Sequence, residues 1–215
     1  MEGYVRMAAV SFPLKNHNKG LCKKLRLECK EIILIKKPNE GDIKMKKING
    51  VDTKVIENIV ENFKKNPEEG IAGYSSSVKW KGGFYAEAQV GDHKPVLIDE
   101  PDWFSGSDKG PSPAELLLSA LGGCLSISVI ATASLMGIKV NSLEVNASGQ
   151  LDLNVLLGLK EGNPGFNEVD VQFTVDSDAD DKQLEELVSK AMEISPVRNS
   201  LERNVQVNST FKRNK

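Results

Sequence analysis

The chain has 215 residues, with 28 basic and 30 acidic side chains and a formal net charge of −2. These mixed charges exclude the basic footprint of a nucleic-acid-binding protein and give no electrostatic reason to bind an anionic membrane. Three cysteines without a repeated spacing do not form a disulfide framework and suit a reducing compartment, so we expect a cytoplasmic protein.

The N-terminal region, residues 1–47, is rich in lysine and has no clear periodicity. We predict an extension that is poorly ordered, of which residues 1–44 are dispensable for folding. It contains Cys22, Cys29 and His17, but a zinc site needs four ligands and no fourth lies nearby. We therefore interpret both thiols as incidental, and we expect no metal and no cofactor.

Residues 48–73 predict an amphipathic helix followed by a linker. Apolar residues recur at helical spacing behind Asp52, which is placed to cap the helix, and Asn66-Pro67 ends the run. The hydrophobic period then changes to two. This change predicts three strands joined by tight turns, over residues 74–81, 84–90 and 93–99.

A long apolar helix is the centre of the predicted fold. Residues 116–138 carry no charge and place apolar side chains on every face of a helical wheel, so protein or lipid must surround them. Ser112 can cap the start, Glu115 lies in the first turn and Gly137 ends the helix. A membrane span has this length, but serines, paired glycines and a thiol lower the hydropathy, which favours a core helix.

Halfway along this helix lies Cys124, the strongest chemical candidate in the sequence. Gly122 and Gly123 precede it and remove side-chain bulk, so that another backbone or a small molecule can approach the sulfur. The competing interpretation is an inert core thiol, since free cysteine is among the most buried residue types. Trp80 and Trp103 are expected to anchor a core or an interface.

After Gly137 the sequence predicts two strands, an amphipathic helix and a final strand. The strands cover 143–151 and 169–175 around a loop at 158–165, the helix covers 178–192, a short turn covers 198–201 and the last strand covers 205–211. Ser195-Pro196-Val197 is expected to break the helix. This order predicts an α+β domain with helices packed against an antiparallel sheet.

Residues 74–211 resemble the OsmC/Ohr family, the osmotically inducible and organic hydroperoxide resistance proteins. The resemblance rests on Trp80-Lys-Gly-Gly-Phe84, His93, Asp99-Glu100-Pro101, Gly110-Pro-Ser-Pro-Ala-Glu-Leu-Leu-Leu, Ala120-Leu-Gly-Gly-Cys124 and Ser195-Pro-Val. It implies an OsmC-like fold over residues 74–215, in which antiparallel strands wrap around two central helices. It also implies an intertwined homodimer with two thiol pockets at the subunit interface.

In the peroxidase members of this family, a thiol on the central helix attacks a hydroperoxide and a second cysteine before Pro-Val resolves the sulfenic acid. An arginine and a glutamate activate the first thiol. Here Cys124 matches the attacking thiol, but Ser195 occupies the position of the resolving cysteine, so an external thiol would have to reduce an oxidised Cys124. The glutamate position holds Ala114, and the arginine position holds Phe84.

We therefore select Cys124 and Glu115 as candidate catalytic residues, and Ser195, His93 and Arg198 as candidate binding residues. Each has a plainer interpretation. Ser195 can cap a helix that begins at the following proline, Glu115 can favour the helix start, His93 can be an exposed strand residue, and Arg198 can be a solvated side chain.

Two functions follow and stay open at this point. One is an antioxidant protein in which Cys124 reduces an organic hydroperoxide as a one-cysteine peroxidase and an external thiol regenerates it. The other is a protein that has kept the fold and the dimer pocket to bind an apolar small molecule without turnover. The absent resolving cysteine, arginine and glutamate favour the second function, whereas the family resemblance favours the first.

Overall fold

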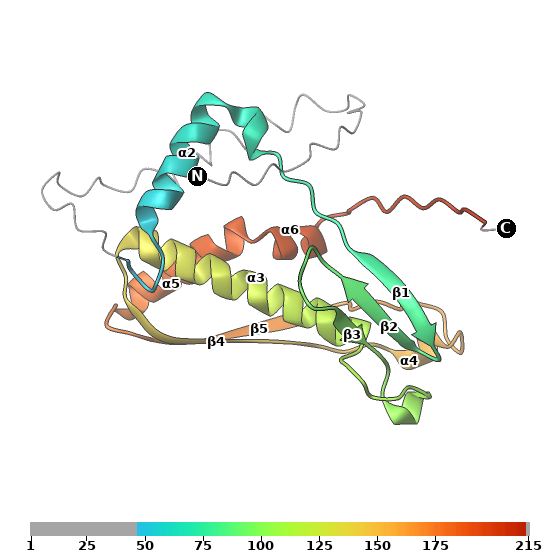
Figure 1. The fold of residues 1–215 in the computed structure, drawn as a ribbon. Coiled ribbons are helices and arrows are strands. Elements are labelled where there is room, and N and C mark those ends of the chain that lie inside the picture. Colours follow the sequence, from blue (N-terminus) through green and yellow to red (C-terminus); the bar gives the residue numbers. More distant parts are fainter. Residues whose placement is uncertain (1–46, 214–215) are drawn as a thin grey trace, which may run out of the picture.

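The computed structural model describes residues 47–213. The predicted N-terminal extension, except Lys47, and its two cysteines lie outside the described residues. Five strands and a set of helices alternate along the described chain (Figure 1). In order they are α2 (Thr53–Lys65), η1 (Pro67–Gly70), β1 (Ser77–Gly82), β2 (Tyr85–Gln89), β3 (Val96–Ile98), η2 (Asp102–Phe104), α3 (Pro113–Met136), β4 (Val140–Gly149), α4 (Leu153–Leu156), β5 (Val169–Ser177), α5 (Asp181–Ile194) and α6 (Pro196–Glu202).

The predicted central helix is α3, and its ends form as the sequence indicates. The Ser112 side chain accepts a hydrogen bond from the Glu115 backbone N–H, and the Glu115 carboxylate accepts one from the Ser112 backbone N–H, which completes a capping box. Gly137 adopts a φ of 75° beyond the last turn, a conformation that costs glycine little. Local sequence therefore fixes both ends of this helix.

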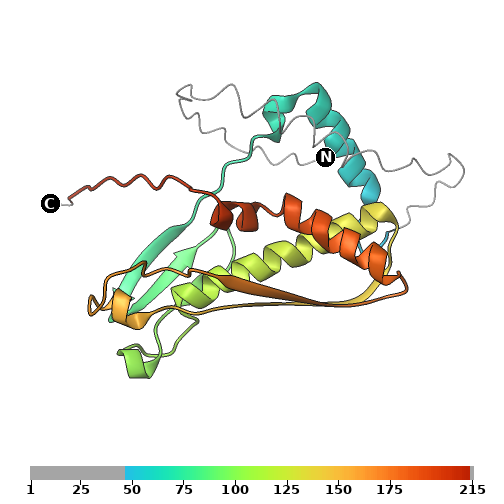
Figure 2. The same cartoon turned by 180° about the vertical axis from the view of Figure 1, so that it is seen from behind.

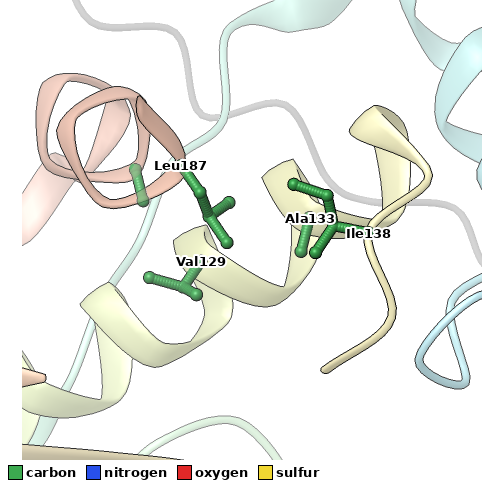
Figure 3. Packing of buried hydrophobic residues seen from close by; sticks show 5 residues of the cluster. Val129, Ala133, Ile138 and Leu187 are labelled. Carbon is green, nitrogen blue, oxygen red and sulfur yellow. The ribbon is translucent and has the colours of Figure 1, made fainter. Parts of the chain in front are cut away.

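The core lies between α3 and α5, the two long helices of the described chain. Val129 and Ala133 on α3 face Leu187 and Ala191 on α5, and all four side chains have no exposed surface (Figure 3). Ile138 closes the C-terminal end of this cluster. Helix α3 thus covers the apolar stripe of α5, as the amphipathic pattern of α5 predicts.

Two small antiparallel sheets accompany the helices, where the sequence predicts one. The first has the strand order β1-β2-β3, and the second pairs β4 with β5 over their full length, with Val145 opposite Phe173. β4 packs along α3, so that α5 and the β4–β5 pair lie on two sides of the central helix (Figure 2). The mixed α+β architecture with antiparallel strands is confirmed.

An asparagine attaches the N-terminal helix α2 to this body. Asn49, with a φ of 53°, directs its side chain to the corner between α3 and β4. Its amide donates to the Ile138 carbonyl at 2.9 Å and to the Ser134 hydroxyl at 3.2 Å, and its oxygen accepts from the Val140 N–H at 2.9 Å. Helix α2 itself, capped by Asp52 as predicted, has no buried residue.

Two predictions about local structure are wrong, and one helix was not predicted. The unpredicted helix, α4, lies in the connection between β4 and β5. The segment after Ser195 forms the helix α6, which agrees with Ser195 as a helix cap but not with a turn at 198–201. Residues 203–213, predicted to contain the last strand, form neither helix nor strand, and Val207 and Phe211 are both 89% exposed. A strand needs a partner edge for its backbone groups, and the described residues of one copy provide none to this segment.

The length and composition of α3 would allow it to cross a membrane. In the structure it packs against α5, β4 and α6, and its buried residues include the polar Ser128, Thr132 and Ser134. This packing fits the core helix of a soluble protein.

Candidate thiol site

Cys124 lies in the middle of α3 with its side chain partly exposed, and it is the one free cysteine among residues 47–213. The two glycines before it have different roles. A Cβ atom at Gly122 would lie 3.4 Å from the Val145 carbonyl oxygen, so this glycine permits close packing of α3 on β4. A Cβ atom at Gly123 would meet nothing within 4 Å, so space is open beside the thiol-bearing turn.

Among the described residues the thiol has one polar partner, which is distant in the sequence. The Ser195 hydroxyl donates a hydrogen bond to the Cys124 sulfur at 3.2 Å. Ser195 has no exposed surface. The packing of α5 on α3 thus brings the two candidate residues together at atomic contact.

Ser195 also joins two helices, as its plainer interpretation predicts. It follows the last residue of α5 and caps α6, where its side-chain oxygen accepts from the Arg198 N–H at 3.4 Å. The Asn199 amide donates to the Ser195 carbonyl at 2.8 Å and to the Glu193 carbonyl at 2.9 Å. The hydroxyl therefore serves as a cap through its oxygen while its proton points to the sulfur.

The Arg198 side chain is engaged away from the sulfur. Its guanidinium forms an ion pair with Glu202 at 2.8 Å, and Nη1 donates to the Met192 carbonyl at 3.1 Å. Met192 lies in the last turn of α5, so Arg198 satisfies a carbonyl that the helix end leaves without an intrahelical donor. The arrangement is that of a structural cation at the junction of α5 and α6.

Glu115 lies at the start of α3, nine residues before Cys124. Nine residues along a helix span about 13 Å and about two and a half turns, so this carboxylate and the sulfur point to opposite sides of the helix. Hydrogen bonds from the Ser112 backbone N–H and the Ser112 hydroxyl lower the pKa of Glu115 below its ordinary 4.5. The capping box accounts for both contacts of this carboxylate.

His93 is exposed in the turn between β2 and β3. Its backbone carbonyl accepts from the Gln89 side chain at 2.8 Å, and its backbone N–H donates to Val90. Within the described part of the chain its imidazole makes no hydrogen bond or ion pair.

The structure thus brings Cys124 and Ser195 together, and the Arg198 backbone N–H donates to the Ser195 hydroxyl. It leaves Glu115 and His93 apart from the sulfur.

Sequence reasoning gave no role to Asp99, which organises the loop before α3. Only 1% of this residue is exposed, and its carboxylate accepts from the backbone N–H groups of Glu100, Ser107 and Lys109 at 2.9, 3.2 and 3.3 Å. Burial raises the pKa of Asp99, but these three bonds outweigh it, and the net pKa lies below the ordinary 3.8. The feature of the sequence that could have drawn attention to this loop is Asp99-Glu100-Pro101, one of the segments on which the family resemblance rests.

Two grooves lie near the N-terminal half of α3. The larger, of about 750 Å³, is lined by apolar side chains that include Trp103, Phe104, Leu118 and Leu156, and by the charged residues Glu100, Asp108, Lys109 and Glu115. The smaller, of about 400 Å³, runs between α3 and β4 beside Gly122 and Gly123. Cys124 lines neither groove, and no cluster of metal-binding side chains is found among the described residues.

The sequence model of the family described as OsmC-like protein matches residues 106–210, the segment that contains both Cys124 and Ser195. This segment is similar to the OsmC-like family. A comparison with curated proteins gives no significant match.

Solved structures of OsmC-like proteins have a similar fold. An OsmC-like protein from Mycoplasma pneumoniae is 21% identical with a TM-score of 0.54, over 61% of this chain and 88% of the other. An OsmC-like protein of unknown function from Vibrio cholerae is 18% identical with a TM-score of 0.51, over 61% and 95%. A protein described as a putative osmotic stress induced and detoxification response protein, from Psychrobacter arcticus, is 20% identical with a TM-score of 0.50, over 60% and 90%.

Proposed function

We propose that this protein is a cytoplasmic, thiol-dependent antioxidant protein of the OsmC kind, in which Cys124 reduces organic hydroperoxides. The observation that carries the proposal is a partly exposed cysteine in the middle of the central helix of an OsmC-like domain, hydrogen-bonded at 3.2 Å to a fully buried serine. Ser195 occupies the position that the resolving cysteine has in the peroxidase members of the family, so the proposed reaction uses Cys124 and an external thiol.

The proposed chemistry has three steps. The Cys124 thiolate attacks the terminal oxygen of the hydroperoxide, the O–O bond breaks, and the products are an alcohol and a cysteine sulfenic acid. An external thiol then displaces water from the sulfenic acid and leaves a mixed disulfide. A second external thiol releases reduced Cys124 and carries away the oxidising equivalents as a disulfide.

We also propose that the working form is a homodimer. Trp80 and Trp103, expected in a core or an interface, are 75% and 73% exposed in one copy, and Ile127 on α3 close to the thiol is 73% exposed. An aromatic side chain contributes roughly 150–250 Å² of surface, so each tryptophan leaves a large apolar side chain for a partner to cover. A second copy that covers Ile127 would also lie close to Cys124, three residues earlier on α3.

The dimer can be tested apart from the chemistry. We expect Ile127→Asp to dissociate the dimer in sedimentation equilibrium, because a carboxylate would be buried without a partner. Lys139→Asp changes the charge of an exposed residue beyond the end of α3 and is the matched control, with no expected effect on association. A wild-type protein that sediments as a monomer at micromolar concentration would contradict the proposal.

The test of the function is a single-turnover oxidation. Reduced protein is mixed with cumene hydroperoxide, quenched at intervals, and the oxidation state of the Cys124 peptide is followed by mass spectrometry. We expect oxidation much faster than that of free cysteine, and complete recovery of the thiol with excess small-molecule thiol. Cys124→Ser is the control, because it leaves Cys22 and Cys29 in place. A rate equal to that of free cysteine would remove the peroxidase assignment.

A second candidate, a non-catalytic binding protein, is favoured by two observations. The Arg198 guanidinium and the Glu115 carboxylate are both engaged in helix ends, and an apolar groove of about 750 Å³ lies at the start of α3. A volume of this size suits a small organic ligand. Saturable binding of an apolar fluorescent probe that Leu118→Glu abolishes, together with slow oxidation of Cys124, would favour this function.

A further inference from the structure

The environment of the Ser195 hydroxyl fixes the direction of its proton. A hydroxyl has one proton to donate and lone pairs that accept. The oxygen of Ser195 accepts the Arg198 N–H, and the residue has no exposed surface from which water could compete. The proton is therefore committed to the Cys124 sulfur at 3.2 Å.

The backbone around Ser195 is held as firmly as its side chain. Pro196 occupies the first position of α6 with its φ restricted, and the Asn199 amide bridges the carbonyls of Ser195 and Glu193. With the backbone held in this way, a rotation of the hydroxyl away from the sulfur would also give up the bond from the Arg198 N–H that caps α6. The contact is thus preorganised, because the entropy of ordering these groups is lost when the protein folds and not when a reactant arrives.

We propose that Ser195 is a positioning residue for Cys124. Its hydroxyl holds the sulfur in one orientation, donates a charge-assisted hydrogen bond to the thiolate during attack, and then donates to the oxygen that the sulfur has gained. The last of these roles rests on the proposed peroxidase function, whereas the first two concern any electrophile that reaches the sulfur.

The same contact explains how a one-cysteine cycle is enforced. The group at the α5–α6 junction that contacts the sulfur is a hydroxyl oxygen, which cannot form a disulfide. A sulfenic acid at Cys124 therefore keeps its hydrogen bond to Ser195 and stays available until a thiol arrives from solution. Ser195 in this way directs the oxidised sulfur to an external reductant.

The experiment compares four variants in the full chain. Ser195→Ala and Ser195→Gly remove the hydroxyl, and glycine is included because it is itself tolerated as a helix N-cap. Ser195→Thr keeps the hydroxyl. Asn199→Ala loosens the same helix junction without a change at the sulfur, and so is the matched structural control. Each protein reacts at neutral pH with iodoacetamide and, separately, with cumene hydroperoxide, and the Cys124 peptide is quantified by mass spectrometry.

We expect alkylation of Cys124 to slow about 10-fold in Ser195→Ala and Ser195→Gly, the loss typical of one charge-assisted hydrogen bond. Ser195→Thr and Asn199→Ala are expected to react within about 3-fold of the wild type. Wild-type rates in both hydroxyl-free variants, or equal slowing in Asn199→Ala, would overturn the proposal. If hydroperoxide oxidises none of the proteins but alkylation follows the expected order, the positioning role stands and only the peroxidase function fails.

Discussion

The Ser195 hydroxyl lies 3.2 Å from the Cys124 sulfur, although 71 positions separate the two residues in the sequence. One residue is in the middle of α3 and the other joins α5 to α6. The contact exists because Leu187 and Ala191 pack α5 against α3, so the helix pair that makes the core also makes the candidate site.

Ser195→Cys should create a disulfide with Cys124. A sulfur at the position of the hydroxyl would lie close enough to bond with little backbone movement. We expect one equivalent of an organic hydroperoxide to convert the variant to an oxidised form that has lost two thiols, as measured by thiol titration and by mass spectrometry of the joined peptides. The double variant Cys124→Ser with Ser195→Cys is the control. Persistence of both thiols after oxidation would show that the two side chains do not meet in solution.

Leu187→Ala should destabilise the domain by about 3 kcal/mol, because Leu187 is fully buried between the two long helices and truncation leaves a cavity. The same change at Leu159, which is 75% exposed, should alter the free energy of unfolding by no more than about 0.5 kcal/mol. Urea denaturation followed by circular dichroism measures both. Equal effects at the two positions would place the core elsewhere.

Asn49→Ala should release α2 from the body of the protein. The change removes three hydrogen bonds, leaves the Val140 N–H without its acceptor, and places alanine at a φ of 53°. We expect the free energy that holds residues 48–65 to the body of the protein to fall by about 2–3 kcal/mol. This loss should appear as faster hydrogen exchange of these residues. Asn58→Ala, on the exposed surface of α2, is the control. Unchanged exchange over 48–65 in Asn49→Ala would contradict this attachment.

Gly106→Ala should disrupt the loop that precedes α3. A Cβ atom there would lie 1.6 Å from the Glu100 carbonyl oxygen, so the backbone must move. We expect destabilisation of at least about 2 kcal/mol. Gly123→Ala is the contrasting change, because its Cβ atom would meet nothing within 4 Å and alanine favours a helix by up to about 1 kcal/mol. Thermal unfolding of the two variants should therefore shift in opposite directions.

Asp99 should make the protein sensitive to acid. Its pKa is lower in the folded state than the ordinary 3.8, so its ionised form stabilises the fold at any pH above that ordinary value. As the pH falls from about 3.8 through the lower folded pKa, the carboxylate takes up a proton and this stabilisation is lost. Asp99→Asn should show a shallower decrease of stability across this range in urea denaturation at successive pH values. Identical slopes would mean that other carboxylates control the acid transition.

Elements whose signals are local could be predicted from the sequence. The capping box of Ser112 and Glu115 and the positive φ of Gly137 depend on residues within a few positions of each other, and the same holds for the cap of α2 at Asp52. The family resemblance also selected Cys124 and Ser195, and it implied that they lie close together, because Ser195 occupies the position of the resolving cysteine. It could not show that Ser195 would both cap a helix and donate to the sulfur.

The errors have a common physical origin. Residues 205–211 alternate like a strand, but a strand forms only where another edge supplies its hydrogen bonds, and alternation carries no information about that edge. Arg198 has the charge expected of an activating cation, but its guanidinium forms an ion pair with Glu202. Glu202 is within reach because α6 places it one helical turn later. Side-chain chemistry is thus visible in the sequence, whereas the partners of a side chain are not.

The sequence by itself determined the long apolar helix, the five strands β1 to β5, and the cysteine that this helix carries, because period, caps and charge act over a few residues. Only the tertiary structure decided how the Ser195 hydroxyl is oriented toward the sulfur and which charged groups are engaged elsewhere. Those outcomes depend on the packing of α5 against α3, and that packing is set by the mutual fit of side chains distant in the chain.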